Sequence, residues 1–415
     1  MRKLAIVNQP LDGVVPPEQT SIGIWTFNVA PHLARHYDVT VYSRWKRSQR
    51  SWKRDERLRY HFVRSLPQRV VGSLKPAIAR LKDQNLPVVA SRLHYLDYAL
   101  AVALQLRRRG VDIVHIHNFT QFVPIVRTFN PRAKLVLHMA GEWLTQLDAR
   151  IMGERAEMCD LILGASDHIT NLIRARFPRL AHRCHTVYNG VDVEKFSPPA
   201  VVRPRDEPKR LLFVGRVSPE KGVHVLLEAL PTIAEKYPGV HLDIVGAVGA
   251  MPAEHLVSLS DDRDVRGLLS LYAEPYGTYL GRLIPRALAN QVNFMGNLPH
   301  DALVDQYRRA DLLINPSYSE SFGMSLVEAL ACETPVVATK VGGMVEIITD
   351  DSLGMLVDRG DVSGLAQAIL TLLDDDERRT VMGKAGREMV LKRFSWSQIG
   401  ERVNRLYAGM TDANG

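Results

Sequence analysis

The sequence has few cysteines, no long apolar run and no composition typical of disorder. Its 415 residues include three widely spaced cysteines, which excludes a disulfide framework and a cysteine-based zinc site. A reducing cytoplasm is therefore the expected location. No apolar run approaches the roughly 18–20 residues of a membrane span. The short apolar stretch Leu4–Val7 ends at Asn8, which does not fit a signal peptide.

The size and composition predict a globular protein of two domains. The chain is 46% hydrophobic and 24% charged, as in ordinary globular proteins. One hydrophobic core rarely extends beyond roughly 250–300 residues, so we expect two domains of about 200 residues each.

The charge is distributed unevenly along the chain. Residues 1–200 carry 30 Lys or Arg and 16 Asp or Glu, whereas residues 201–415 carry 23 and 29. The densest basic stretch, Arg44–Lys82, has 13 basic residues and two acidic ones. It is either a solvated surface or a patch for anionic lipid or a phosphorylated acceptor. Nucleic acid is not expected as a partner, because no helix-turn-helix, zinc or RNA-binding signature accompanies the charge.

The first half of the chain alternates short apolar runs with helical patterns, which predicts a parallel sheet covered on both faces. The expected helices include Ile24–His36, Tyr95–Arg109 and Asp167–Phe177. The expected strands are rich in Val, Ile or Leu: Leu4–Gln9, Val39–Arg44, Ile113–Asn118, Lys134–Met139, Leu161–Ser166 and Thr186–Asn189.

A second parallel sheet is expected after a linker. Residues 197–209 are rich in proline and charge and lack periodicity. Residues 248–290 are less regular and are expected to form a loop with one or two helices. The alternation otherwise resumes with a helix at Val223–Lys236 and strands at Arg210–Gly215, His241–Gly246, Val292–Gly296, Leu312–Ser317, Pro335–Thr339 and Met355–Val357. Ligands of such sheets bind beyond the carboxyl ends of the strands, so we expect a site in a cleft between the two domains.

The first motif with a chemical meaning is Phe213–Gly222. A strand ends at Gly215, and a short loop then carries Arg216 and Lys221 to the start of a helix. Two cations beside a helix N-terminus are suited to a diphosphate. Taken alone, the same pattern also describes an ordinary strand–loop–helix corner with surface cations.

The second motif is Glu320–Glu328. Glu320 lies in a loop after an expected strand, and Glu328 lies on the following helix. Gly323 permits close approach of the backbone to a ligand and frees N–H groups at the helix start. Carboxylates accept hydrogen bonds from vicinal hydroxyls, so one could address a sugar ring and the other a ribose. Glutamate pairs at this spacing are otherwise common.

Together and in this order, the two motifs resemble the retaining glycosyltransferases of family 4. The resemblance implies the α/β architecture called GT-B, with two Rossmann-like domains whose parallel sheets face an interdomain cleft. It implies an acceptor-binding domain at 1–195, a nucleotide-sugar-binding domain at 196–394, and a C-terminal helix at about 395–415 that packs back onto the first. The matching pieces are 187–192, Phe196, 215–216, 221–222, Tyr307, 310–311, 316–331, 334–338 and 342–343.

The resemblance also implies roles for individual residues of the second domain. Arg216 and Lys221 would hold the donor diphosphate, and Glu320 would bind sugar hydroxyls. Glu328 would bind the ribose hydroxyls. The backbone would cradle sugar and phosphate at three successive residues, Phe322, Gly323 and Met324.

In the first domain, His138 matches a family histidine that faces the sugar, although a purely structural histidine is the alternative. Asn189 would lie at the hinge, near the acceptor side. The family's first loop often has a glycine pair, whereas here Gly13 and Gly23 are separated, so neither is assigned a phosphate contact. No metal is assigned, because the histidine pair at 115 and 117 falls short of a zinc ligand set.

The expected activity is that of a retaining hexosyltransferase in glycan, glycolipid or polysaccharide biosynthesis. A UDP-sugar is the favoured donor, GDP-mannose the next and ADP-glucose a third. The acceptor would be a glycan, a lipid-linked group or a small molecule, and an anionic acceptor at the inner membrane face is favoured. No cofactor is expected, because the nucleotide sugar is a substrate. The alternatives are a GT-B nucleotide-sugar epimerase and a catalytically silent donor-binding subunit.

Overall fold

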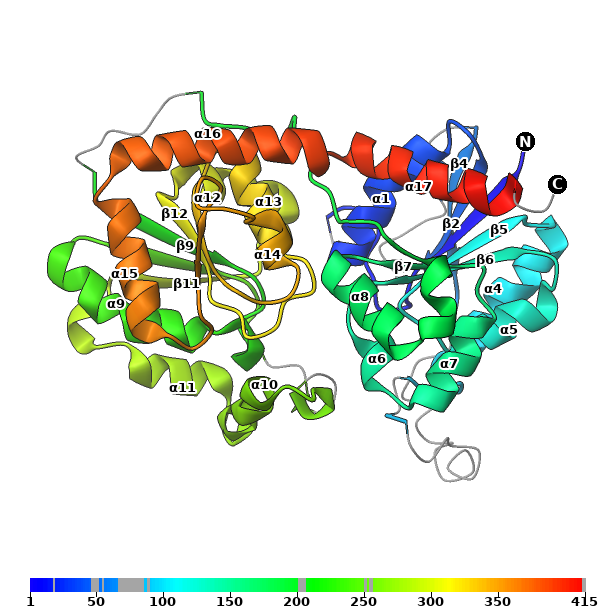
Figure 1. The fold of residues 1–415 in the computed structure, drawn as a ribbon, viewed down its shortest axis with the longest axis horizontal. Helices are drawn as coiled ribbons and strands as arrows, with labels where there is room; N and C mark the ends of the chain where they lie inside the picture. Colours follow the sequence, from blue (N-terminus) through cyan, green and yellow to red (C-terminus); the bar gives the residue numbers. More distant parts are fainter. Residues whose placement is uncertain are drawn as a thin grey trace. The chain divides into compact units, whose positions relative to one another are not determined.

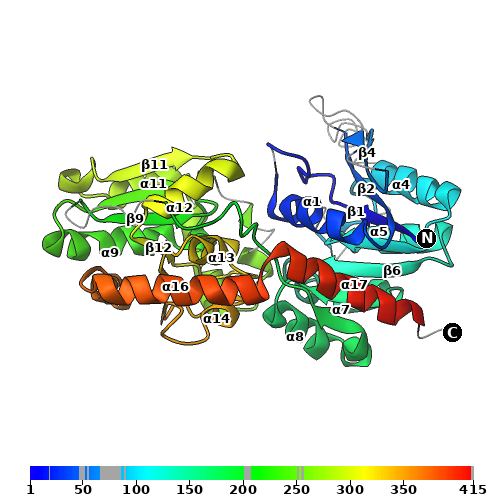
Figure 2. The same cartoon turned by 90° about the horizontal axis from the view of Figure 1, so that it is seen from above.

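The computed structural model describes residues 1–17, 19–45, 52–53, 56–65, 86–87, 90–200, 207–249, 252–253 and 257–412. It divides into two compact units, the first comprising 1–189 and 396–415 and the second 190–395. Each unit is a sheet with helices on both faces (Figures 1 and 2). The predicted class, two Rossmann-like units with parallel sheets, is confirmed.

The first unit contains an eight-stranded sheet in the order β3-β4-β2-β1-β5-β6-β7-β8. All pairs are parallel except β3–β4. The chain runs outward from β1 to β2 and β4 and then returns to β5 on the other side of β1. The strands are β1 Lys3–Val7, β2 Asp38–Arg44, β3 Trp52–Lys53, β4 Leu58–Val63, β5 Ile113–His117, β6 Lys134–Met139, β7 Leu161–Gly164 and β8 Cys184–Thr186.

The last helix of the chain belongs to the first unit, where α17 lies beside α1 (Figure 1). Gly400 permits this crossing, because a Cβ there would lie 2.5 Å from the Cβ of His32. The helices of this unit are α1 Ser21–Leu33, α4 Leu96–Arg109, α5 Phe122–Phe129, α6 Trp143–Gln146, α7 Ala149–Glu157, α8 Asp167–Arg176 and α17 Trp396–Asp412.

The second unit contains a six-stranded parallel sheet in the order β11-β10-β9-β12-β13-β14. The chain runs from β9 to β10 and β11 and then returns to β12 on the other side of β9. The switch point of this sheet, where ligands of doubly wound folds bind, therefore lies between β9 and β12. The strands are β9 Arg210–Val214, β10 His241–Val245, β11 Val292–Gly296, β12 Leu312–Asn315, β13 Val336–Thr339 and β14 Met355–Val357.

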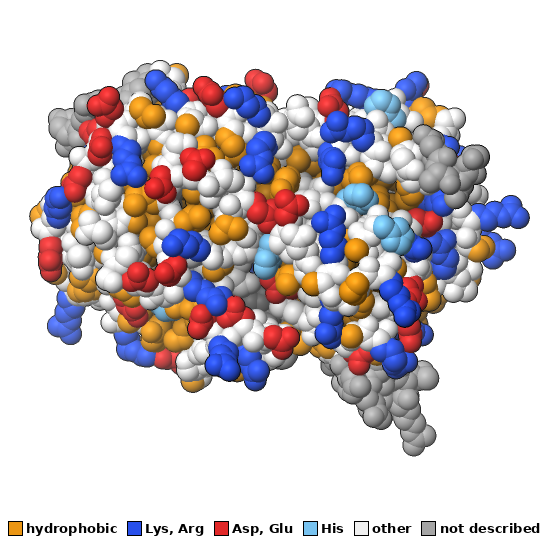
Figure 3. Space-filling model, viewed as in Figure 1, with side chains coloured by type: hydrophobic (Ala, Val, Ile, Leu, Met, Phe, Trp, Pro, Cys, Tyr) orange, Lys and Arg blue, Asp and Glu red, His pale blue; other side chains and the backbone are white. Residues whose placement is uncertain are grey.

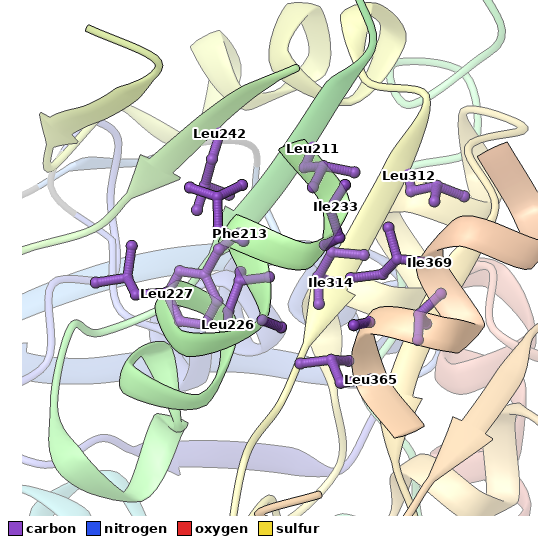
Figure 4. Close-up of a cluster of buried hydrophobic side chains, with 14 of the residues drawn as sticks. Leu211, Phe213, Leu226, Leu227, Ile233, Leu242, Leu312, Ile314, Leu365 and Ile369 are labelled. Carbon is purple, nitrogen blue, oxygen red and sulfur yellow. The ribbon is translucent and has the colours of Figure 1, made fainter. Parts of the chain in front are cut away.

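Alternate residues of the second sheet pack beneath α9 and α15 (Figure 4). Leu211 and Phe213 of β9 and Leu312 and Ile314 of β12 are at most 1% exposed. Because successive strand residues point to opposite faces, these four share one face of the sheet. The helices of this unit are α9 Val223–Lys236, α10 Arg263–Gly267, α11 Tyr276–Leu283, α12 Leu303–Arg309, α13 Met324–Ala331, α14 Met344–Ile347, α15 Val362–Leu373 and α16 Asp376–Arg393.

Two details differ from the sequence-based expectation. The strand predicted at Thr186–Asn189 is Cys184–Thr186, because its pairing with β7 begins at Cys184. The division between the units falls after Asn189, since the Val191 N–H donates to the Phe394 carbonyl at 2.8 Å and ties the following segment to the second unit. Most of the basic stretch Arg44–Lys82 lies outside the described residues. On the face shown in Figure 3, the described Lys and Arg side chains of the first unit are dispersed among other types.

Candidate functional site

Arg216 lies in the loop that follows β9 and is held by a buried carboxylate. Its Nη2 lies 3.0 Å from Oε1 of Glu220, and the Ser218 hydroxyl donates to the same oxygen at 2.6 Å. The Glu220 side chain is 2% exposed, whereas that of Arg216 is 41% exposed. The guanidinium is therefore anchored on one side and open to solvent on the other.

Lys221 connects this loop to the loop that follows β12. Its Nζ lies 2.7 Å from Oε2 of Glu320 and 3.4 Å from the Ser319 carbonyl. Burial alone would raise the pKa of Glu320, but the charge and hydrogen bond of Lys221 outweigh it and lower the pKa below its usual value. Glu320 is thus a carboxylate at neutral pH, and a cation already lies against it.

Backbone contacts fix the two loops against one another. The Tyr318 N–H donates to the Glu220 carbonyl at 2.8 Å and joins them directly, while the Gly343 N–H, from the loop after β13, donates to the Glu320 carbonyl at 3.2 Å. A Cβ at Gly222 would lie 2.0 Å from the Pro316 carbonyl oxygen. Only glycine fits there, and its φ of 69° also favours glycine. Both motifs therefore meet at the switch point between β9 and β12.

The α13 helix begins directly beyond this junction. Gly323, at φ 105°, precedes its first residue, Met324, and supplies no capping side chain. The Leu326 N–H donates to the Gly323 carbonyl at 3.0 Å, so the N–H groups that can face an anion are those of Met324 and Ser325. Phe322 is 2% exposed and its ring packs on that of Phe394, with ring centroids 5.5 Å apart. The backbone of Phe322, rather than its ring, is the part that can meet a ligand.

Glu328 lies one turn farther along α13 and is bonded at both oxygens. His300 Nε2 lies 2.7 Å from Oε1, and the Tyr307 hydroxyl donates to Oε2 at 2.7 Å. Burial lowers the pKa of His300, but the Glu328 carboxylate outweighs it, so the pKa of His300 lies above its usual value. The carboxylate is held in one orientation.

His138 belongs to the first unit and is 2% exposed. The register of β5 and β6 places it beside His117, with ring centroids 5.1 Å apart, and His115 and Trp25 complete the cluster. Burial lowers the pKa of His138 to about 3, an effect that the backbone of Val187 partly offsets. His138 is therefore a neutral imidazole at physiological pH.

The histidine cluster has three members, where the sequence alone indicated two. One ring nitrogen from each of His115, His117 and His138 lies within 4.8 Å of the others. Tetrahedral zinc would require these nitrogens to be about 3.3 Å apart, given bonds of 2.0–2.1 Å. Among the described residues, neither a carboxylate nor a thiol joins the cluster. That this cluster binds no metal stays a prediction.

Asn189 and the two separated glycines of the first loop also belong to the first unit. Asn189 is its last residue before the division. Gly13 and Gly23, distant in sequence, are in contact, since a Cβ at Gly23 would lie 1.7 Å from the Gly13 carbonyl oxygen. Their role visible in the structure is packing of the first loop against α1.

Three supporting residues were not assigned roles from the sequence. Glu220 holds Arg216, and His300 and Tyr307 hold Glu328. Arg216 and Glu220 lie in the same short segment between β9 and α9, so their opposite charges a few residues apart are the one local signal for the first pair. The other two contacts join separate elements and leave no local pattern.

Models of two families match almost the entire chain. "Glycosyltransferase Family 4" matches residues 22–195, and "Glycosyl transferases group 1" matches residues 197–389. Among curated relatives, a glycogen synthase of Mycobacterium tuberculosis is 30% identical, with 74% of this chain and 72% of the relative aligned. A D-inositol 3-phosphate glycosyltransferase of Kribbella flavida is 29% identical, with 72% of each chain aligned.

Solved structures share the fold over the full chain. A sucrose-phosphate synthase of Thermosynechococcus elongatus matches with a TM-score of 0.73 at 21% identity, covering 99% of this chain and all of the other. Anabaena HepE in complex with UDP-glucose matches with a TM-score of 0.67 at 19% identity, covering 98% and 99%. With both family models and these relatives in agreement, the chain belongs to the GT4-type glycosyltransferases and has the GT-B fold.

Proposed function

We propose that this glycosyltransferase moves a hexose from a UDP-sugar to an acceptor hydroxyl with retention of the anomeric configuration. The observation that carries the proposal is the junction of Arg216, Lys221 and Glu320 at one switch point. Cations suited to a diphosphate lie there beside a carboxylate suited to sugar hydroxyls. UDP is favoured over GDP and ADP because Anabaena HepE, a structural neighbour, was solved with UDP-glucose.

The proposed mechanism relies on charge that develops as the sugar–phosphate bond breaks. The sugar becomes oxocarbenium-like, while negative charge grows on the departing diphosphate. Arg216, Lys221 and the first N–H groups of α13 would stabilise that charge. The departing diphosphate would take the acceptor proton on the same face. Glu320 would orient the sugar by accepting hydrogen bonds from the sugar hydroxyls. Lys221 would contact both the Glu320 carboxylate and the diphosphate.

The other assigned residues would bind rather than react. Glu328 would accept hydrogen bonds from the ribose, and the backbone at 322–324 would meet sugar and phosphate. His138, as a neutral imidazole, would donate a hydrogen bond to the sugar but would not act as an acid. Asn189 would lie at the hinge.

A donor panel tests this function directly. The purified protein would be incubated with UDP-, GDP- and ADP-sugars, and release of the nucleoside diphosphate would be followed. NMR of the product would assign the anomeric configuration. Inversion, or conversion of the donor into an epimer without transfer, would contradict the proposal.

The transfer step is expected to need no divalent cation, because Arg216, Lys221 and the helix N-terminus supply positive charge at the diphosphate. Adding Mg²⁺ or Mn²⁺, or a chelator, should change the initial rate less than about twofold, a difference below 0.5 kcal/mol. The measurement is the initial rate of nucleotide release in each buffer. A strict requirement for either ion would contradict this assignment.

We also propose that the basic stretch Arg44–Lys82 attaches the protein to anionic membranes and so to an anionic acceptor. Each Lys or Arg near such a surface contributes about 1 kcal/mol, and the attraction is screened within roughly 8–10 Å at physiological salt. The protein should therefore co-sediment with anionic but not neutral liposomes and be released by high salt. No helix of the described residues is both long and apolar enough to cross a bilayer.

The membrane proposal has a direct control. Replacing Arg47, Arg50, Lys53 and Arg54 by serine should weaken liposome binding and leave UDP affinity unchanged, because the donor motifs lie in residues 213–328. Absence of binding to anionic liposomes at low salt would show that the stretch is a solvated surface or that it binds a soluble acceptor.

A further inference from the structure

Glu328 has an unusual environment for a carboxylate that is to bind a ligand. Its side chain is 6% exposed, and both oxygens already accept a hydrogen bond of 2.7 Å, one from His300 and one from Tyr307. A carboxylate has about four lone-pair sites. Two donors therefore fix its plane and leave two sites for hydroxyl groups.

His300 is itself held by two elements. It begins the short helix η9 His300–Ala302, and its ring packs on that of Phe196 with centroids 5.0 Å apart. Arg308 of α12 donates to the Ser197 carbonyl at 2.7 Å and to the Ser197 hydroxyl at 2.9 Å, which ties the Phe196 segment to that helix. The imidazole is thus packed in place before any ligand arrives, and its 19% exposure leaves one edge near solvent.

Resting on the proposed function, we propose that His300 is a positioning residue that sets donor affinity by holding Glu328 toward the ribose. Tyr307 acts with it on the other oxygen. The ribose does not change during transfer, so its contacts are equally strong in the ground state and the transition state. Loss of His300 should therefore raise the dissociation constant and KM for the donor and leave kcat nearly unchanged.

The charge of His300 gives the contact a pH dependence. The ionisable groups that act on it are Glu328 from α13, Asp301 from η9 and Lys195 from the segment before the linker, and Tyr307 from α12 donates to the other oxygen of Glu328. Because the pKa of His300 is raised in the folded protein, the ion pair is complete below the ordinary histidine pKa and is lost as pH rises through the raised value. UDP affinity should fall over that same range.

The test is titration calorimetry with UDP. His300→Ala should bind UDP about 10- to 150-fold more weakly, the loss expected for one hydrogen bond to a charged group. His300→Gln, which keeps an N–H near the position of Nε2, should recover most of the affinity but lose the pH dependence. Tyr307→Phe should weaken binding to a similar extent. The matched control is His241→Ala, at the amino end of β10, which should bind as the wild type does.

A double-mutant cycle distinguishes positioning from general damage. In a Glu328→Ala background, His300→Ala should have no further effect on UDP affinity, because its action passes through the missing carboxylate. 2′-Deoxy-UDP, which lacks one ribose hydroxyl, should lose less affinity than UDP when His300 is replaced.

The outcomes separate this inference from the proposed function. If the wild type binds neither UDP nor GDP, both fail. If the wild type binds UDP and His300→Ala binds it equally well, only the role of His300 fails. The role of His300 also fails if His300→Ala still weakens UDP binding in the Glu328→Ala background. It fails as well if His300→Ala lowers kcat and leaves UDP affinity unchanged.

Discussion

Glu320→Ala should lower sugar transfer about tenfold to more than 100-fold while the protein stays folded. The carboxylate is the group we assign to the sugar hydroxyls, and losing a hydrogen-bonded partner in such a site costs about 1–3 kcal/mol or more. The substitution also leaves Lys221, whose side chain is 14% exposed, without the carboxylate it contacts at 2.7 Å. The measurement is nucleotide release at saturating donor, with circular dichroism to verify the fold.

The control for Glu320 is another glutamate of the same unit that pairs with a cation. Glu274 binds Arg282 at the surface of the second unit, so Glu274→Ala should retain wild-type turnover. Because the pKa of Glu320 is lowered, the wild-type rate should not decline from protonation of this group until pH falls below the ordinary carboxyl range. Wild-type activity in a folded Glu320→Ala protein would remove Glu320 from the site.

Arg216→Ala and Lys221→Ala should each reduce kcat by about 10²–10³-fold, as loss of one donor to a developing oxyanion does. Both cations act on one diphosphate, so the double variant should lose less than the sum of the two single losses in free energy. Single-turnover rates at saturating donor measure the effect on chemistry directly. Additive losses would indicate that the two cations act on separate groups.

Arg210 provides the matched control for Arg216. Its side chain is also 41% exposed and lies near a carboxylate, that of Asp243, at 3.7 Å. It occupies the amino end of β9, whereas Arg216 follows the carboxyl end of the same strand. Arg210→Ala should therefore leave kcat unchanged, and an equal loss in both variants would point to a general effect of charge on the second unit.

Several features of this protein were determined by local sequence. The inner strands β7, β12 and β13 are short apolar runs that are buried throughout, because a strand covered on both faces has no solvent side for polar residues. The helix Val223–Lys236 and the strands Lys134–Met139 and Val292–Gly296 have the bounds that the sequence predicted. The two motifs were also visible locally, because a loop between a parallel strand and the next helix must carry its ligand-binding residues within a few positions.

Other features depend on contacts between distant segments, and only the tertiary structure decided them. The register of β5 and β6 joined His138 to the pair at 115 and 117. The return of the chain to β12 beside β9 joined Lys221 to Glu320. The packing of η9 and α12 against α13 gave Glu328 both its hydrogen-bond donors. Sequence patterns indicate which face of an element is apolar. Which polar side chains meet depends on strand order and register, and these two are fixed only when the whole sheet packs.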